Sequence, residues 1–328
     1  MKILVTGGAG FIGTNFVYLM VKKGHEVVVL DKLTYAGGRD NLQPLGKKVK
    51  LIVGDICDRK AVKKAVKNKD WIVHFAAESH VTRSETDPKL FYRVNVEGTK
   101  IMIEESLAAG VKKFLHISTD EVYGSKDSGS FKEKDKLPGD SQASSAYAKS
   151  KSLADDLAQN FAKKGAPILI VRMTNNFGPW QFPEKALPRW ITNLLLGEKI
   201  PVWGKGLQVR DWLYAPECAK AIDFVLRRGK LGEVYNIAAN NKPEITNRRA
   251  AEMLCEALEL NPKKWIEFVP DPRPQHDFRY AISTKKLESL GWKPERLPKQ
   301  QFAETIKWYQ KHEAWWKKRK EEAERIYK

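Results

Sequence analysis

Two pairs of side chains in this 328-residue sequence have types and spacings suited to acid and base chemistry. Tyr147 and Lys151 lie four apart in a stretch with helical character, so both project from one helix face. An ammonium group near a phenol, with the positive charge of an oxidised cofactor beyond it, lowers the tyrosine pKa, and such a tyrosine can take a proton from a hydroxyl group. Asp120 and Glu121 are adjacent, and two neighbouring carboxyl groups titrate apart into a neutral acid and a charged base.

The carboxyl pair indicates chemistry beyond hydride transfer, which by itself needs no such acid and base. Removing water from a sugar needs both an acid and a base. Successive side chains of a strand point to opposite faces, so both acids reach one site only if the strand ends by Thr119 and the chain turns there. We predict that turn. The alternative is that Thr119 and Asp120 only cap a short helix.

The elements that must position these residues alternate in the order of a parallel sheet with crossover helices. Runs rich in β-branched residues predict strands at residues 2–6, 26–30, 50–54, 71–76, 113–118 and 168–173. Amphipathic stretches predict helices at about residues 11–23, 58–68, 88–109 and 146–163. The fold class is therefore α/β, with a doubly wound parallel Rossmann sheet.

The alternation loses its regularity after about residue 175, where prolines and tryptophans become frequent. We expect a first domain at residues 1–175 that holds a dinucleotide. A smaller, partly interleaved α+β domain at residues 176–328 would bind the substrate, with some of its segments returning to the first domain.

The segment GGAGFIG follows the first predicted strand and opens the first predicted helix. Its glycines permit a tight turn, a close approach of the backbone to a pyrophosphate and close packing of helix on strand. Asp31 ends the second strand, where an acid can hold a ribose 2′-hydroxyl and repel a 2′-phosphate. These features favour NAD over NADP, although the nearby Lys32 and Arg39 could soften that preference.

The third strand is followed by Asp55 and Ile56, at the place where the edge of an adenine would lie. An aspartate before the stretch CDRKAVKKAV could equally be a helix cap. Sequence alone leaves these two roles of Asp55 open.

Composition limits the class of protein. With 42% hydrophobic and 30% charged residues, the chain has the composition of a soluble globular protein, and no apolar run approaches the length of a spanning helix. We expect a cytoplasmic protein without membrane contact. The net charge of +18 is spread along the chain, which favours a solvated surface over a nucleic-acid site. The scattered cysteines and histidines show no metal-ligand spacing, so no metal is expected.

The chain resembles the extended short-chain dehydrogenases of the NAD-dependent epimerase/dehydratase family, and most closely the dTDP-glucose 4,6-dehydratases. The resemblance covers nearly the whole chain. It is carried by the segments GGAGFIG, DKLTYAG, FAAESHV, STDEVYG, YAKSK, NNFGP, FPEK, KGLQVRDWLY, GEVYNI and RPQHDFRYAI. The acid pair distinguishes these dehydratases from the sugar epimerases, which look alike at the cofactor end.

The resemblance implies a role for each residue of the chemical site. Tyr147 deprotonates the 4-hydroxyl of the sugar while C4 is oxidised, and Thr119 holds the same oxygen. Glu121 removes the C5 proton that the new ketone makes acidic, and the protonated Asp120 releases the C6 hydroxyl as water. Hydride then returns to C6, so NAD ends as it began.

The resemblance also implies binding residues for the cofactor and the nucleotide-sugar. The expected NAD contacts are Gly7, Gly10, Phe11, Ile12, Gly13, Asp31, Lys32, Asp55, Ile56, Ala76, Tyr147 and Lys151. The expected substrate contacts are Ser79, His80, Ser84, Asn176, Lys185, Arg210, Arg273, His276 and Tyr280. Each substrate contact could instead be a surface or packing residue.

Departures from the family pattern leave the nucleotide base open. Thr82 stands where the family usually has Asp, and Trp180 and Gln181 replace a Tyr-His pair. A UDP- or CDP-sugar therefore stays an alternative to dTDP-glucose, and a 4-epimerase stays an alternative activity. A protein that only senses the dinucleotide is disfavoured because the tyrosine, the lysine and both acids are present. A homodimer, formed through the helices near residues 88–109 and 146–163, is expected by resemblance.

Overall fold

The computed structural model describes residues 1–137, 145–271, 278–295 and 297–325. Within them, the largest sheet has seven strands in the order β10-β6-β5-β4-β1-β2-β3, and each neighbouring pair is parallel. Its strands are β1 (Lys2–Thr6), β2 (Glu26–Asp31), β3 (Val49–Val53), β4 (Trp71–His74), β5 (Lys113–Thr119), β6 (Ile168–Met173) and β10 (Val234–Ile237). The predicted doubly wound α/β fold is confirmed.

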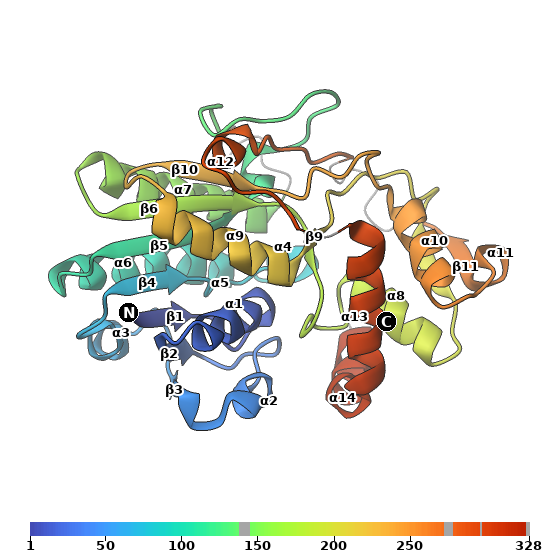
Figure 1. The fold of residues 1–328 in the computed structure, drawn as a ribbon, viewed down its shortest axis with the longest axis horizontal. Helices are drawn as coiled ribbons and strands as arrows, with labels where there is room; N and C mark the ends of the chain where they lie inside the picture. Colours follow the sequence, from blue (N-terminus) through green and yellow to red (C-terminus); the bar gives the residue numbers. More distant parts are fainter. Residues whose placement is uncertain (138–144, 272–277, 296, 326–328) are drawn as a thin grey trace.

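Helices cover both faces of this sheet (Figure 1). One face is covered by α1 (Phe11–Lys22) and α9 (Ala215–Arg228), which also pack against each other. The other face is covered by α3 (Arg59–Val66), α6 (Thr99–Ala108) and α7 (Ala146–Lys163). Because both faces are buried, the strands can be almost continuously apolar, as the sequence shows.

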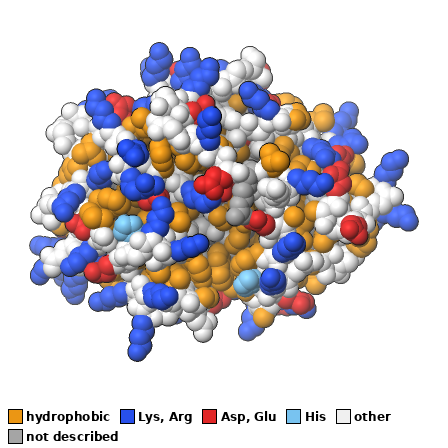
Figure 2. Space-filling view, viewed as in Figure 1, with side chains coloured by type: hydrophobic (Ala, Val, Ile, Leu, Met, Phe, Trp, Pro, Cys, Tyr) orange, Lys and Arg blue, Asp and Glu red, His pale blue; other side chains and the backbone are white. Residues whose placement is uncertain are grey.

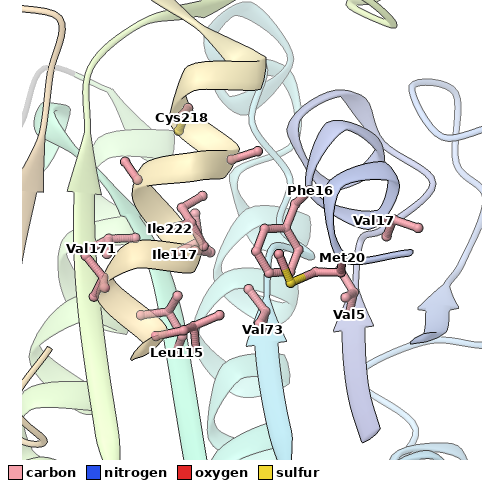
Figure 3. Close-up of a cluster of buried hydrophobic side chains, with 14 of the residues drawn as sticks. Val5, Phe16, Val17, Met20, Val73, Leu115, Ile117, Val171, Cys218 and Ile222 are labelled. Carbon is pink, nitrogen blue, oxygen red and sulfur yellow. The ribbon is translucent and has the colours of Figure 1, made fainter. Parts of the chain in front are cut away.

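Figure 3 shows the core on the α1 and α9 side of the sheet. Phe16 and Met20 of α1 lie against β1 and β4, while Ile222 of α9 lies over β5 and β6. The side chains of these three residues are fully buried. This packing holds the carboxyl ends of the central strands in a constant position, and those ends are where a doubly wound sheet binds ligands.

The short helical segments of the first half lie mainly in the connections between strands and helices. They are α2 (Arg39–Leu42), η1 (Gln43–Lys48), α4 (Val81–Thr86), α5 (Pro88–Tyr92), η2 (Arg93–Gly98) and η3 (Asp120–Tyr123). The predicted helix at 88–109 is thus divided into α5, a π-helical segment η2, and α6. The predicted fourth strand ends two residues early, at His74, because Phe75 and Ala76 already belong to the loop beyond the sheet.

The second half of the chain forms a separate apolar cluster around several tryptophans. Its helices are α8 (Ala186–Leu195), α10 (Asn247–Ala257), α11 (Pro262–Trp265), α13 (Pro298–Lys311) and α14 (Glu313–Glu324). Its short strands pair as β7 (Asn176–Phe177) with β9 (Leu213–Tyr214) and β8 (Ile200–Trp203) with β11 (Ile266–Val269). Between these segments, α9, β10 and α12 (Lys285–Ser289) return to the large sheet, so the two halves are interleaved.

The described part of the chain contains no helix with the length and hydropathy required to cross a lipid bilayer.

Candidate active site

One cavity of about 850 Å³ lies over the carboxyl ends of the central strands and is closed by segments of the second half. It brings together predicted residues that are far apart in the sequence. Those that line it are Gly7, Gly10, Phe11, Ile12, Gly13, Asp31, Lys32, Asp55, Ile56, Ala76, Ser79, His80, Thr119, Asp120, Glu121, Tyr147, Lys151, Asn176, Lys185, Arg210 and Tyr280. Predicted cofactor, chemical and substrate residues therefore share one continuous space.

Ser84 does not line this cavity, contrary to the sequence prediction. It lies on α4 with its side chain fully buried, and its Oγ donates to the Val81 carbonyl oxygen at 2.7 Å. The short helix directs Ser84 into its own first turn, while Thr82 and Glu85 line the cavity instead. The predicted residues Arg273 and His276 lie outside the described residues.

The glycine-rich loop between β1 and α1 is shaped for close backbone contact with an anion. Gly7 has a φ of +67°, and a Cβ there would lie 2.6 Å from the Ala76 nitrogen. A Cβ at Gly13 would lie 2.3 Å from the Gly7 oxygen, so the loop folds this way only without side chains at these positions. Gly10 precedes α1 without a side-chain cap, which leaves the first N–H groups of the helix open to a ligand. The loop therefore fits a dinucleotide diphosphate.

Asp31 ends β2 and connects the glycine-rich loop to the next segment. Its carboxylate accepts hydrogen bonds from the Ala9 N–H at 2.9 Å and from the Leu33 N–H at 2.8 Å. Burial raises the pKa of Asp31, and these two hydrogen bonds oppose that rise. Asp31, which the sequence predicts as the residue that holds the ribose, thus also fixes the backbone at Ala9 and Leu33.

Asp55 does not cap the helix that follows it, so the cap alternative is wrong. The cap of α3 is Asp58, whose Oδ1 accepts from the Lys60 N–H at 2.9 Å. Asp55 instead accepts from the Cys57 N–H at 2.8 Å and pairs with Lys32 Nζ at 2.9 Å. Lys32 is therefore engaged by a carboxylate at the edge of the cavity.

The predicted turn at the acid pair is confirmed. Strand β5 ends at Thr119, and the chain turns into the 3₁₀ helix η3, so Asp120 and Glu121 both line the cavity. Thr119 also caps η3, because its Oγ1 accepts from the Glu121 N–H at 3.3 Å. Thr119 therefore does cap a short helix, as the alternative prediction states. This cap is compatible with a chemical role for Asp120 and Glu121.

Asp120 is buried, with 2% of its surface exposed. Burial raises the pKa of Asp120 well above its ordinary value, and the neighbouring charge of Glu121 raises it further. A hydrogen bond from Thr119 and the charge of Arg210 oppose these effects. Oδ1 accepts from Thr119 Oγ1 at 3.2 Å, whereas Oδ2 has no hydrogen-bond partner among the described residues. These effects together favour the protonated form of Asp120, the form that can donate a proton.

Tyr147 and Lys151 lie one turn apart at the start of α7, which Ser145 caps by accepting from the Ala148 N–H at 3.1 Å. Lys151 Nζ donates to the Ile117 carbonyl oxygen at 2.7 Å, which fixes the lysine against β5. Burial lowers the pKa of Lys151 to about 8, opposed by the charge of Asp155.

The protein groups raise the pKa of Tyr147. Burial is the largest cause, and the charge of Glu121 adds to the rise, while a hydrogen bond with Thr119 opposes it. The predicted lowering of this pKa depends on the positive charge of an oxidised nicotinamide as well as on Lys151, so it stays a prediction for the protein with its cofactor bound. The protein groups alone therefore keep Tyr147 protonated.

The end of the cavity that the second half of the chain lines carries buried polar atoms that lack partners among the described residues. Asn176, on β7, donates through Nδ2 to the Thr174 oxygen at 2.9 Å but leaves Oδ1 unpartnered. The same holds for Asn175 Oδ1, Trp212 Nε1 and Asn247 Oδ1. Arg210 lies over the Tyr280 ring at 4.7 Å. Buried polar groups are normally hydrogen-bonded, so these atoms point to a polar ligand.

Sequence analysis missed Asn175, Trp212, Asn247 and Glu184 as cavity residues. Glu184 is 2% exposed and accepts from Tyr35 Oη at 3.0 Å, while His80 Nε2 lies 3.8 Å away. Signals existed for three of the four, because Asn175 belongs to NNFGP, Glu184 to FPEK and Trp212 to KGLQVRDWLY. Nothing local distinguishes Asn247, since tertiary contacts alone bring it to the site.

Comparison with known proteins agrees with this geometry. The model of the NAD dependent epimerase/dehydratase family matches residues 3–238. A dTDP-glucose 4,6-dehydratase of Streptomyces niveus is 40% identical, over 96% of this chain and 95% of its own. The low-salt glycan biosynthesis protein Agl12 of Haloferax volcanii is 45% identical, over 90% and 94%. The crystal structure of DesIV, a dTDP-glucose 4,6-dehydratase of Streptomyces venezuelae with NAD bound, superposes with a TM-score of 0.91 at 39% identity, over 97% of this chain and all of that chain.

Proposed function

The chain belongs to the NAD dependent epimerase/dehydratase family, and we propose that within this family it is a nucleotide-sugar 4,6-dehydratase. It converts dTDP-glucose, or a close nucleotide-glucose, to the 4-keto-6-deoxy sugar. The observation that carries the proposal is the buried Asp120, which has a raised pKa and an unpartnered Oδ2 and lines the same cavity as Glu121 and Tyr147.

NAD is the cofactor, and the glycine-rich loop, Asp31 and the segment at Asp55 and Ile56 would hold it. When bound, it supplies reversible hydride exchange with the sugar carbons. The uncapped N-terminus of α1 would face the diphosphate, and Asp31 would hold the adenosine ribose.

The first task of the protein is to remove the proton of the 4-hydroxyl. Tyr147 takes this proton while Thr119 Oγ1 holds the same oxygen. Since burial and Glu121 raise the pKa of Tyr147, its deprotonation requires positive charge beside the phenol. Lys151 supplies part of this charge as its ammonium form.

The second task is to expel the 6-hydroxyl. A ketone at C4 makes the C5 proton acidic, and Glu121 removes it as a base. Asp120 donates its proton to the C6 hydroxyl, which leaves as water. Reduction at C6 and return of a proton to C5 then complete the 4-keto-6-deoxy product, and Asp120 is reprotonated for the next cycle.

The direct test is to incubate the purified protein with a panel of dTDP-, UDP- and CDP-glucose and to analyse the products by mass spectrometry. We expect a product lighter by one water, formed fastest from dTDP-glucose. A product of unchanged mass with inverted C4 would identify an epimerase instead. Faster conversion of UDP- or CDP-glucose would leave the proposed reaction unchanged but assign a different nucleotide base to the substrate.

Other properties of the protein follow as proposals. We expect a cytoplasmic homodimer that contacts its neighbour through α5, η2, α6 and α7, and a substrate domain at residues 176–328. Nucleic acid is not among the expected partners: Figure 2 shows lysine and arginine scattered among acidic side chains over the face in view, rather than gathered in a stripe. Light scattering of the purified protein would give the mass of the assembly.

A further inference from the structure

Helix α14 lies where the two halves of the chain meet and contacts both (Figure 1). Toward the second half, Glu324 accepts two hydrogen bonds from Arg189 of α8, at 3.0 and 2.8 Å. Toward the first half, Arg319 donates to both carboxylate oxygens of Asp40 on α2, at 2.8 and 2.7 Å. The helix therefore connects the substrate side of the cavity to the segment that follows the cofactor loop.

A chain of buried hydrogen bonds leads from α14 to the glycine-rich loop. Trp315 Nε1 donates to Asn41 Oδ1 at 2.7 Å, and Asn41 Nδ2 donates to the Ala9 carbonyl oxygen at 2.7 Å. The Ala9 N–H in turn donates to Asp31 at 2.9 Å. Asn41 and Ala9 are fully buried, and Trp315 is 9% exposed. Water therefore cannot readily replace any of these bonds.

The indole fixes the orientation of the Asn41 amide. An indole nitrogen can only donate, so Asn41 must present its oxygen to Trp315 and its NH₂ group to Ala9. Without the indole donor, Asn41 Oδ1 is buried without this hydrogen bond, and the amide keeps only its contact with the Ala9 oxygen. The Asn41 side chain can then shift, and the Ala9 oxygen that it holds can shift with it.

Ala9 is also the point where the cofactor loop is attached. The Gly38 N–H donates to the same Ala9 oxygen at 3.2 Å. Gly37, beside it, lines the cavity, and a Cβ there would lie 3.1 Å from Asp31 Oδ1. A shift of Ala9 would therefore move both the loop that faces the diphosphate and the segment that covers Asp31.

We propose that Trp315 and Asn41 are positioning residues for the cofactor, through which the C-terminal helix holds the glycine-rich loop in the form that retains NAD. This inference rests on the proposed function, because it requires NAD to be the ligand of the loop. Neither residue lines the cavity, so both act through Ala9 and Asp31.

The neighbouring Trp316 offers a matched control. It lies on the same helix, is 1% exposed, and its Nε1 donates to the Tyr309 oxygen of α13 at 2.8 Å. Trp316→Phe therefore removes one buried indole donor from the same helix, as Trp315→Phe does. Of the two indoles, only that of Trp315 belongs to the chain of hydrogen bonds that reaches the glycine-rich loop.

The test measures how fast NAD leaves the holoenzyme. Protein purified with its bound NAD is mixed with excess isotopically labelled NAD, and exchange is followed by mass spectrometry of the bound nucleotide. We expect Trp315→Phe to exchange NAD about tenfold faster than the unmodified protein, the effect of about one hydrogen bond. Trp316→Phe should stay within about twofold, although both variants lose thermal stability.

A second variant tests the path itself. Asn41→Asp keeps an acceptor for Trp315 but loses the donor to Ala9, so it should also exchange faster. If the two residues act in one chain, the double variant exchanges no faster than Asn41→Asp alone. If the NAD exchange rate of the double variant rises by the product of the two single effects, the two residues act independently, and the proposed path is overturned.

The outcomes separate this inference from the proposed function. Equal exchange rates for Trp315→Phe and Trp316→Phe, in protein that holds NAD and forms the dehydrated product, would overturn the positioning role alone. Protein that binds no NAD under any condition would overturn both.

Discussion

Asp155 and Arg172 form a buried ion pair that links the helix of Tyr147 and Lys151 to strand β6 of the large sheet. Arg172 Nε donates to Asp155 Oδ2 at 3.0 Å and its NH2 group donates to Oδ1 at 2.7 Å. The two side chains are 1% and 0% exposed. Arg172 also donates to Tyr123 Oη at 2.8 Å, at the end of η3. One guanidinium thus contacts the elements that carry both pairs of chemical residues.

Removing the carboxylate of this ion pair should strongly destabilise the protein. Asp155→Asn leaves the charge of Arg172 buried without its partner, which costs about 3 to 5 kcal/mol. Urea denaturation of the variant and the parent protein measures this change in the free energy of unfolding. A loss below about 1 kcal/mol would mean that the Arg172 charge finds other compensation.

The same substitution at Asp120 should have the opposite effect on stability. The pKa of Asp120 is raised in the folded protein, so the fold retains a proton that the unfolded chain has released, and rising pH destabilises it. Asparagine does not titrate. Asp120→Asn should therefore be more stable than the parent by on the order of 1 kcal/mol at neutral pH, with elimination lost.

The pH dependence of this gain provides its control. The advantage of Asp120→Asn should shrink as the pH falls toward about 4, the ordinary aspartate pKa, and disappear below it, because Asp120 is then protonated in both folded and unfolded chains. Melting temperatures measured across this pH range check the prediction. A variant less stable than the parent at neutral pH would show that Asp120 is ionised in the fold.

Glu121→Gln should separate the two halves of the reaction. An amide cannot remove the C5 proton, so dehydration should slow by at least about a hundredfold, while oxidation at C4 continues. Absorbance of the reduced nicotinamide after mixing with dTDP-glucose reports the oxidation, and mass spectrometry reports the dehydration. Formation of the dehydrated product at the parent rate would exclude Glu121 as the base.

The oxidation step should weaken as the pH rises through about 8. Burial lowers the pKa of Lys151 to about 8, and above that value the lysine loses the charge that favours ionised Tyr147. Measuring C4 oxidation against pH in the Glu121→Gln background isolates this step. Lys151→Arg, which stays charged, should be slower overall but should lack the alkaline decline; an identical decline would assign it to another group.

Gly13→Ala should prevent NAD retention. The added Cβ would lie 2.3 Å from the Gly7 oxygen, so the loop must move away from the diphosphate position. The control is Gly24→Ala, where no atom lies within 4 Å and only the φ of +79° is unfavourable, at a cost of about 1 kcal/mol. The NAD content of the two purified variants measures the difference, and equal contents would contradict the prediction.

Local patterns in the sequence predicted six of the seven strands of the large sheet, the crossover helices between them and the glycine-rich loop, but not α9 or β10. The strands are continuous apolar runs because both faces of the sheet are covered, and the glycines mark positions where a side chain would collide with backbone. The turn after Thr119 was also predictable, because two adjacent acids cannot face one site from a regular strand. Each of these features depends on a few consecutive residues.

The pKa values of the groups in the site, and the residues that hold those groups in place, depend on the tertiary structure. Burial raises the pKa of Tyr147, and Asp58 rather than Asp55 caps α3. Trp315 reaches Asn41 across 274 positions of the chain. Desolvation and long-range hydrogen bonds depend on which segments pack together, and no spacing within one segment records that. The sequence by itself thus determined the chemical groups and the fold that carries them, whereas packing determined their charge and orientation.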